Sequence, residues 1–260
     1  MAGEKAIFIS GGASGIGLAV ARLFAARGWR VGLADIDAAG LESARALLPG
    51  AATYAMDVRD HAQWVAALAD FTAATGQLDV LFNNAGVPHS GPLTECEVAG
   101  IERAVAINLV GVLKGAHAAH RFLKATPGAC MLITGSAAGI HGTPGAATYS
   151  ATKFAVRGLA EALDGEWAPD GIRVRTLMPS FIETPLLDHT VNTGNHSVRQ
   201  AVRAAGLEIT PVEQVAEAAW RAVHGNRLHT QVGKTAHRLW FLARWAPGLL
   251  RKTMRNRLPR

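Results

Sequence analysis

The chain has 260 residues, of which 49% are hydrophobic and only 6% aromatic, and it contains 28 glycines. A chain of this length can bury a core that needs no disulfides, and its two cysteines, Cys96 and Cys130, form no CxxC pair. The net charge of +6 comes from the C-terminal end, because residues 225–260 include nine basic side chains and no acidic one. These features argue against a disulfide framework, a metal site and a general nucleic-acid-binding fold.

The N-terminal residues lead directly into a strand-like segment, so we expect no signal peptide. No uninterrupted apolar stretch reaches the roughly 18 residues of a membrane span. Together with the unpaired cysteines, this predicts a cytoplasmic location.

A glycine-rich loop follows the first predicted strand, at residues 5–10. The loop reads GGASGIG over residues 11–17, and the helix after it is expected to end at Gly28. Glycines let the backbone approach a pyrophosphate, and the helix N-terminus offers free N–H groups and the positive end of a dipole. The loop therefore predicts a nucleotide site, with an ordinary tight turn as the alternative.

An aspartate ends the second predicted strand, at residues 30–34. Asp35 lies 18 residues after Gly17, close to the ~20 expected for an acid that binds the adenosine ribose. Its carboxylate would repel a 2′-phosphate, and Asp37 adds to that repulsion. We therefore expect NAD rather than NADP, the alternative being a solvated aspartate without a ligand.

Two more strands are predicted at residues 53–56 and 78–82. Asp57 follows the first of them and is expected either to meet an adenine amino group or to cap the helix at residues 62–74. The second leads into Asn83-Asn84-Ala85-Gly86, which resembles a turn and leaves room for a flat cofactor.

One long helix is predicted over residues 101–123. Asn108 lies in its apolar part, which is unfavourable unless the polar atoms of the side chain are used. His117 and His120 have no third ligand beside them in the sequence, so we expect no metal there. A strand at residues 129–134 follows, and Ser136 lies just beyond its end.

Tyr149 and Lys153 are four residues apart on a predicted helix, so both side chains lie on one face. The ammonium is expected to lower the pKa of the phenol from its usual value near 10 and make it a usable proton donor. The alternative is a surface lysine one turn from a half-buried tyrosine.

The remaining elements complete an alternation of strands and helices. We expect a strand at residues 173–178, an irregular lid at about 185–210, a helix at 211–224 and a strand at 228–232. The alternation predicts an α/β fold with one Rossmann-type doubly wound domain over residues 1–233. Its central sheet is expected to be seven-stranded and mostly parallel, and residues 234–260 form a basic, Trp-rich extension.

Because ligands in open parallel sheets sit at the carboxyl ends of the strands, the predicted site residues should lie together. With these residues in hand, the sequence resembles the short-chain dehydrogenase/reductase family over residues 5–233. The motifs are Ser10-Gly11-x-x-x-Gly15-Ile16-Gly17, Asn83-Asn84-Ala85-Gly86, and the set Asn108, Ser136, Tyr149 and Lys153. Pro179 also matches, whereas Ser180 replaces the family's usual glycine.

The resemblance implies an enzyme in which Tyr149 is the general acid for ketone reduction or the base for alcohol oxidation. Lys153 would assist Tyr149 and bind the nicotinamide ribose, Ser136 would hold the substrate oxygen, and Asn108 would anchor a proton-relaying water. The cofactor-binding residues implied are Gly11, Ser14, Gly15, Ile16, Gly17, Asp35, Ile36, Asp57, Val58, Asn84, Ala85, Gly86, Tyr149, Lys153, Pro179, Ile182 and Thr184.

The expected substrate is a hydrophobic secondary alcohol or ketone. The candidate pocket residues are mostly apolar and include no Arg or Lys: His89, Ala138, His141, Phe181, Leu186 and Leu187. On the lid, His189, Arg199 or Arg203 would be the source of any charge. The alternatives are an NADP-dependent carbonyl reductase and a non-catalytic nucleotide-binding sensor or scaffold.

Small-residue helices around residues 105–119 and 151–163 resemble those of the family's dimer and tetramer interfaces, so a homo-oligomer is expected. In the C-terminal extension, Trp and Leu residues alternate with arginines. This pattern is typical of a helix at a membrane surface, and packing on the lid or on a neighbouring subunit is the alternative.

Overall fold

A single parallel sheet forms the centre of the protein. The computed structural model describes residues 4–188 and 197–255. The strands are β1 (Ala6–Ser10), β2 (Arg30–Asp35), β3 (Ala52–Ala55), β4 (Val80–Asn83), β5 (Cys130–Thr134), β6 (Arg173–Pro179) and β7 (His229–Val232). They pair in the order β3-β2-β1-β4-β5-β6-β7, and every pairing is parallel. The predicted doubly wound fold is confirmed.

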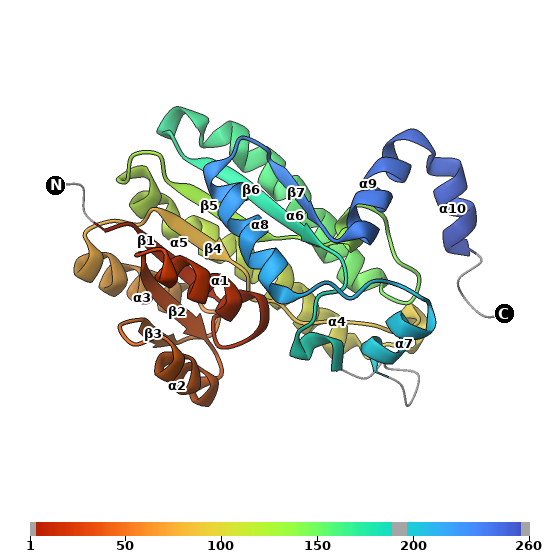
Figure 1. Cartoon of the computed structure of the whole chain (residues 1–260), viewed down its shortest axis with the longest axis horizontal. Helices are drawn as coiled ribbons and strands as arrows, with labels where there is room; N and C mark the ends of the chain where they lie inside the picture. Colours follow the sequence, from red (N-terminus) through yellow and green to blue (C-terminus); the bar gives the residue numbers. More distant parts are fainter. Residues whose placement is uncertain (1–3, 189–196, 256–260) are drawn as a thin grey trace.

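Helices cover both faces of this sheet (Figure 1). One layer contains α1 (Gly15–Ala26), α2 (Ala38–Leu47) and α8 (Val212–His224). The other contains α3 (His61–Thr75), α5 (Val112–Lys124) and α6 (Ala147–Glu166). Strands covered on both faces have no polar side to alternate with, which is why β1 reads AIFIS and is buried at every position.

The strand order reverses between β1 and β4, which lie side by side at the centre of the sheet. Chains leaving neighbouring strands on either side of this reversal turn toward opposite faces, and a crevice opens at the carboxyl edge. The crevice expected from this topology therefore lies beside Ser10 and Asn83, the last residues of the two strands.

The helix predicted over residues 101–123 is not uniform. It consists of α4 (Val98–Val105), a π-helical turn η2 (Ala106–Gly111) and α5. Asn108 lies in the π-helical turn with no exposed surface, and its side chain exchanges two hydrogen bonds with the backbone of Val87, at 2.8 and 2.9 Å. The Asn108 amide bonds a neighbouring loop rather than its own helix, which explains why a polar residue is tolerated in this apolar setting.

The segment predicted as a lid contains two short helices, η5 (Pro185–Asp188) and α7 (Val198–Ala204). Its two ends meet, because Thr210 donates its backbone N–H to Phe181 and Glu183 donates to Thr210. Arg199 is held by Glu183 and by Asp188, at 2.7 Å from the latter, so its charge is already compensated. His189 lies outside the described residues.

The C-terminal extension forms two helices, α9 (Lys234–Trp245) and α10 (Pro247–Arg255), which project as a hairpin from one edge of the domain (Figure 1). One side of α9 packs on the domain, where Leu239 and Trp240 contact a small cluster around Met178. The Arg157 guanidinium lies 5.0 Å from the centre of the Trp240 ring. Among the described residues no helix has both the length and the apolar character required to cross a bilayer.

Candidate active site

A cavity of about 510 Å³ opens at the carboxyl edge of the sheet. The loops that follow β1, β2, β3, β4, β5 and β6 all contribute to its wall, together with α6 and the C-terminal helices. The cavity is mainly apolar with a few polar side chains, which is typical of a binding site for small organic molecules.

The glycine loop forms one end of the cavity. Gly11 and Gly15 adopt φ values of +66° and +55°, which residues with a side chain rarely tolerate. A Cβ on Gly17 would lie 2.0 Å from the carbonyl oxygen of Gly11, so only glycine fits at this start of α1. The bare backbone and the helix N-terminus behind it suit the pyrophosphate of a dinucleotide.

Asn84 ties three strand ends together beside this loop. Its Nδ2 donates to the carbonyl oxygen of Ser10 at 3.0 Å, and its Oδ1 accepts from the Thr134 hydroxyl at 2.8 Å. The Ser10 hydroxyl in turn accepts the backbone N–H groups of Asn84 and Ala85, at 3.0 and 3.1 Å. The sequence predicts only a turn beside a cofactor for this motif, whereas the Asn84 amide also fixes the edge of the sheet.

Asp35 lies at the end of β2 and lines the cavity. Its carboxylate accepts the backbone N–H groups of Ala13 and Asp37, both at 3.1 Å. The Asp35 side chain is partly exposed, so it keeps lone pairs that can accept from a ligand. Asp37 instead caps α2 by accepting from Gly40 and does not line the cavity.

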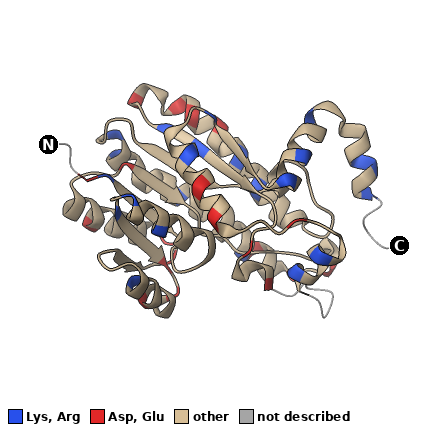
Figure 2. Cartoon of the chain, in the orientation of Figure 1, with Lys and Arg blue, Asp and Glu red and all other residues tan. Residues whose placement is uncertain are grey.

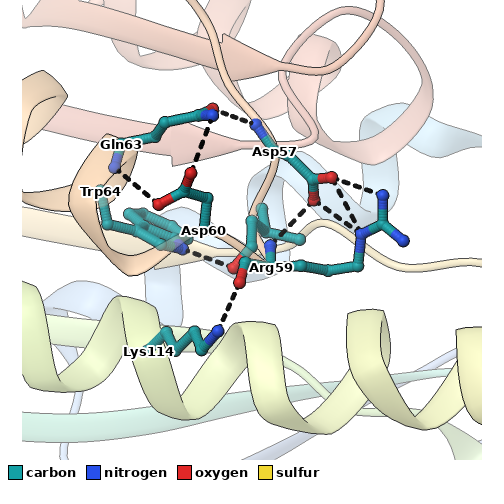
Figure 3. A network of polar contacts seen from close by, with 7 residues as sticks. Asp57, Arg59, Asp60, Gln63, Trp64 and Lys114 are labelled. Atoms are coloured by element: carbon teal, nitrogen blue, oxygen red, sulfur yellow. Dashed lines mark hydrogen bonds and ion pairs between the residues drawn. The ribbon is translucent and has the colours of Figure 1, made fainter.

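The loop after β3 is fixed by a polar network that includes Arg59 (Figure 3). The Asp57 carboxylate accepts from Nε and Nη2 of Arg59 at 2.9 and 2.6 Å, and this guanidinium lowers the pKa of Asp57. Asp60, not Asp57, is the N-cap of α3, so the capping alternative for Asp57 is wrong.

Two further contacts hold this loop. Gln63 accepts the backbone N–H of Asp57 at 2.7 Å, and the indole N–H of Trp64 donates to the carbonyl oxygen of Val58 at 3.0 Å (Figure 3). Lys114 donates to the carbonyl oxygen of Arg59. The network keeps Val58 in the cavity wall and leaves the Asp57 carboxylate occupied by Arg59.

The residues expected to carry the chemistry converge on the centre of the cavity, where Ser136, Tyr149 and Lys153 all line the wall. The Ser136 hydroxyl accepts from the backbone N–H of Ala138 at 3.1 Å, which fixes the serine just beyond β5. The Lys153 ammonium donates to the carbonyl oxygen of Thr134 at 2.8 Å and lies 5.6 Å from the centre of the Tyr149 ring.

Burial sets the protonation of these two groups. Burial raises the pKa of Tyr149, and a side-chain hydrogen bond with Ser136 opposes this rise. Burial also lowers the pKa of Lys153 to about 8. The expected lowering of the tyrosine pKa by Lys153 is therefore not found in the chain alone, because loss of hydration is the largest influence on the phenol.

All predicted cofactor and pocket residues line the cavity except Gly15, Gly17 and His141, and of the predicted catalytic residues only Asn108 does not. Gly15 and Gly17 belong to the glycine loop, where Gly17 allows close approach to the backbone of Gly11. Asn108 supports Val87, which does line the cavity. His141 is partly exposed and lies outside the cavity wall, so its place in the pocket was wrongly predicted.

Several lining residues were missed by the sequence analysis. Arg59 and Arg103, both exposed, contribute charge to the wall. The expectation of a pocket without arginine is therefore wrong. Thr235, Leu239 and Met254 reach the cavity from the C-terminal extension. Arg103, Leu239 and Met254 lie within helices rather than just after a strand, and no local sequence signal marks them.

The histidines of α5 form pairs rather than a metal site. His117 lies 3.0 Å from His61 of α3, and His120 lies 2.9 Å from Asp170. Within residues 4–188 and 197–255, no three His, Cys, Asp or Glu side chains are grouped closely enough to hold a metal ion.

Comparison with known proteins agrees with this geometry. A model of the short chain dehydrogenase family matches residues 5–195. The chain is 36% identical over 185 residues to the 3-alpha-(or 20-beta)-hydroxysteroid dehydrogenase of Mycobacterium tuberculosis, covering 71% of each protein. It is 40% identical over 189 residues to momilactone A synthase of Oryza sativa subsp. japonica, covering 70% of this chain and 68% of the other.

The fold is also similar to a solved structure. A short chain dehydrogenase/reductase from Burkholderia phymatum in complex with NAD superimposes with a TM-score of 0.82 and 25% identity, over 99% of this chain and 98% of that one. The match extends beyond the motifs to the whole sheet and both helical layers. The chain therefore belongs to the short-chain dehydrogenase/reductase family of oxidoreductases.

Proposed function

We propose that the protein is an NAD-dependent dehydrogenase or reductase that interconverts a hydrophobic secondary alcohol and its ketone. One observation carries the proposal: Ser136, Tyr149 and Lys153 line the same cavity as the glycine loop. A proton donor, an oxygen-binding hydroxyl and a buried cation thus share one space with a dinucleotide cradle. When bound, the nicotinamide supplies or accepts the hydride.

The protein's own groups would handle the oxygen and the proton. In the reductive direction the Tyr149 hydroxyl donates its proton to the carbonyl oxygen, while the Ser136 hydroxyl donates a hydrogen bond to that oxygen as negative charge develops. In the oxidative direction Tyr149 accepts the proton of the alcohol. Burial keeps Tyr149 protonated in the chain alone, which suits the donor role.

Lys153 is proposed to assist Tyr149 and to bind the nicotinamide ribose. Among residues 4–188 and 197–255 its ammonium has one hydrogen-bond acceptor, the Thr134 carbonyl oxygen, which leaves two further N–H donors for a ligand. The water that Asn108 is expected to anchor stays a prediction, since Oδ1 and Nδ2 of this amide each already bond Val87.

The preference for NAD rests on charge at the end of β2. Asp35 lines the cavity there and would accept ribose hydroxyls but repel a 2′-phosphate. Arg59 is the nearest lining cation in sequence, and Asp57 already neutralises it. The NAD bound to the similar Burkholderia protein supports the same preference.

A hydrophobic substrate is proposed because Phe181, Leu186, Leu239 and Met254 contribute to the wall of the cavity. The hydroxysteroid dehydrogenase activity named for the Mycobacterium relative fits such a wall. The exposed Arg103 could contact a polar group at the far end of the substrate.

We also propose a catalytic domain over residues 1–233 with a lid at about 185–210, followed by the extension at 234–260. The described parts of the lid supply Leu186, Leu187 and Val198 to the cavity wall, which supports this division. A cytoplasmic location is proposed, in keeping with the free thiols of Cys96 and Cys130.

The test follows absorbance at the nicotinamide band with NAD or NADP and a panel of hydrophobic secondary alcohols. We expect turnover with NAD and a fall of about 10²–10⁴-fold in kcat for Tyr149→Phe, with NADH binding retained. The matched control is Tyr54→Phe, at the chain's only other tyrosine, whose hydroxyl bonds Asp70 outside the cavity. Equal activity of Tyr149→Phe and the control would refute the mechanism.

A further inference from the structure

The C-terminal hairpin of α9 and α10 has an inner face packed on the protein. Leu239 and Trp240 of α9 contact the cluster around Met178. On α10, Leu250 and Met254 are only 2% and 5% exposed. These contacts fix which side of the hairpin faces outward.

The outer face carries large apolar side chains that are left in water. Phe241, Trp245 and Leu249 are 61%, 69% and 58% exposed. Phe241 and Trp245 are four residues apart on α9, so they lie on one side of that helix. Large apolar side chains that are exposed together are typical of an interaction surface.

The same two helices are strongly basic, and Figure 2 shows Lys and Arg but no Asp or Glu along them. The exposed basic residues of the two helices are Lys234, Arg238, Arg244, Arg251, Lys252 and Arg255. None of the six forms an ion pair with any described residue. The sequence has no acidic residue after Glu217, and the carboxylate of Glu208, which lies at the start of α9, accepts the backbone N–H of Lys234 at 2.8 Å.

We propose that this outer face of α9 and α10 docks on an anionic lipid bilayer surface. Aromatic and leucine side chains enter the headgroup region, while arginine and lysine stems lie along the apolar boundary and their charges meet lipid phosphates. Charge complementarity selects this occupant over a second copy of the chain. A two-fold contact through this face would place two sets of cations against each other.

Docking leaves the cavity wall intact, since Leu239 and Met254 line the cavity from the inner side of the same helices. The bilayer would therefore lie directly outside one wall of the cavity. Membrane docking does not depend on the proposed reaction, and it can be measured without cofactor or substrate.

The experiment is co-sedimentation of the full chain with phosphatidylcholine vesicles that contain or lack phosphatidylglycerol. We expect binding only to the anionic vesicles, and weaker binding as salt screens the charges. Phe241→Ser with Trp245→Ser should lower the partition coefficient by about tenfold or more. Arg238→Gln with Arg244→Gln should also lower the partition coefficient by about tenfold or more.

Matched controls replace exposed apolar residues with serine, or exposed arginines with glutamine, elsewhere on the protein. Leu47→Ser with Leu93→Ser controls for lost apolar surface, and Arg22→Gln with Arg45→Gln controls for lost charge. Circular dichroism checks that every variant is folded. No binding to anionic vesicles, or equal losses in control and tail variants, would overturn the proposal. A fall in particle mass of the tail variants without vesicles, measured by light scattering, would instead assign this face to contact between copies and also overturn it.

Discussion

At the scale of single residues, loss of hydration dominates the electrostatics of the cavity. Tyr149 and Lys153 are one helical turn apart, yet burial disfavours the charged form of each. A bound cofactor would change the surroundings of both groups, so their pKa values describe the chain alone. The lowered pKa of Lys153 also affects stability, because a pKa difference between the folded and unfolded states makes the free energy of unfolding depend on pH.

The first prediction concerns Lys153, whose pKa falls from 10.5 when unfolded to about 8 in the fold. Between these values the unfolded chain binds more protons, so the contribution of Lys153 to stability rises with pH. From about pH 8 to about pH 10, the free energy of unfolding of wild type should rise by about 2 kcal/mol relative to that of Lys153→Met, as measured by urea denaturation.

A reference variant isolates this effect. Burial also raises the pKa of Cys130 to about 11, which makes the contribution of this thiol to stability fall as the pH rises. This contribution is the same in wild type and in Lys153→Met, so it cancels in their difference. The exposed Lys252 serves as the control, and Lys252→Met should give a difference from wild type that is flat over the same pH range. A flat difference for Lys153→Met as well would contradict the prediction.

The second prediction concerns Asp35 and the choice of cofactor. Asp35→Asn keeps an oxygen acceptor but removes the negative charge, so it weakens charge-assisted hydrogen bonds to ribose hydroxyls. We expect kcat/KM with NAD to fall about tenfold and the ratio of NADP to NAD use to rise. Asp37→Asn, which alters a helix cap outside the cavity, should raise the ratio less than Asp35→Asn does.

At the scale of elements, the π-helical turn η2 is where a helix adapts to a neighbouring loop. The turn places Asn108 so that its amide pairs with both backbone groups of Val87. A Cβ on Gly86 would lie 3.2 Å from Asn108 Oδ1 and 3.8 Å from Lys153 Nζ, so this contact is next to the Lys153 ammonium. The helix irregularity thus positions the loop after β4.

Asn108→Ala tests this role through stability. The substitution leaves two partly buried backbone groups of Val87 without partners, at a cost of about 2–4 kcal/mol in the free energy of unfolding. Urea denaturation measures the loss. Glu102→Ala, at an exposed position on α4, should change the stability by less than about 0.5 kcal/mol, and a similar small effect at Asn108 would disprove the role.

At the scale of the whole molecule, apolar side chains remain exposed on the helical layer that carries Tyr149. Val110, Leu113 and Phe154 are 36%, 43% and 42% exposed on η2, α5 and α6. These elements coincide with the small-residue helices expected to form subunit contacts. We propose that this layer is the interface of a homo-oligomer, separate from the outer face of α9 and α10.

Light scattering coupled to size-exclusion chromatography tests the assembly. Leu113→Glu with Phe154→Glu should at least halve the particle mass, because two buried, unpaired carboxylates oppose the contact. Leu47→Glu, on the exposed side of α2, should leave the mass unchanged. An unchanged mass in the double variant would exclude this layer as the interface.

The sequence by itself determined the order of the elements and the location of the site. Short apolar runs, the glycine loop and polar residues just after strands depend on local backbone geometry, which a single sequence reveals. For this reason the seven strands were predicted in order, and Gly11, Asp35 and Ser136 were placed at one edge of the sheet.

Only the tertiary structure decided which groups are buried together. The direction of the Tyr149 pKa shift and the use of the Asn108 amide by Val87 depend on the loss of water around a group or on a neighbour distant in the sequence. The same holds for Met254, which reaches the cavity through the packing of α10. Hydration and long-range contact are properties of the assembled fold, and no local pattern encodes them.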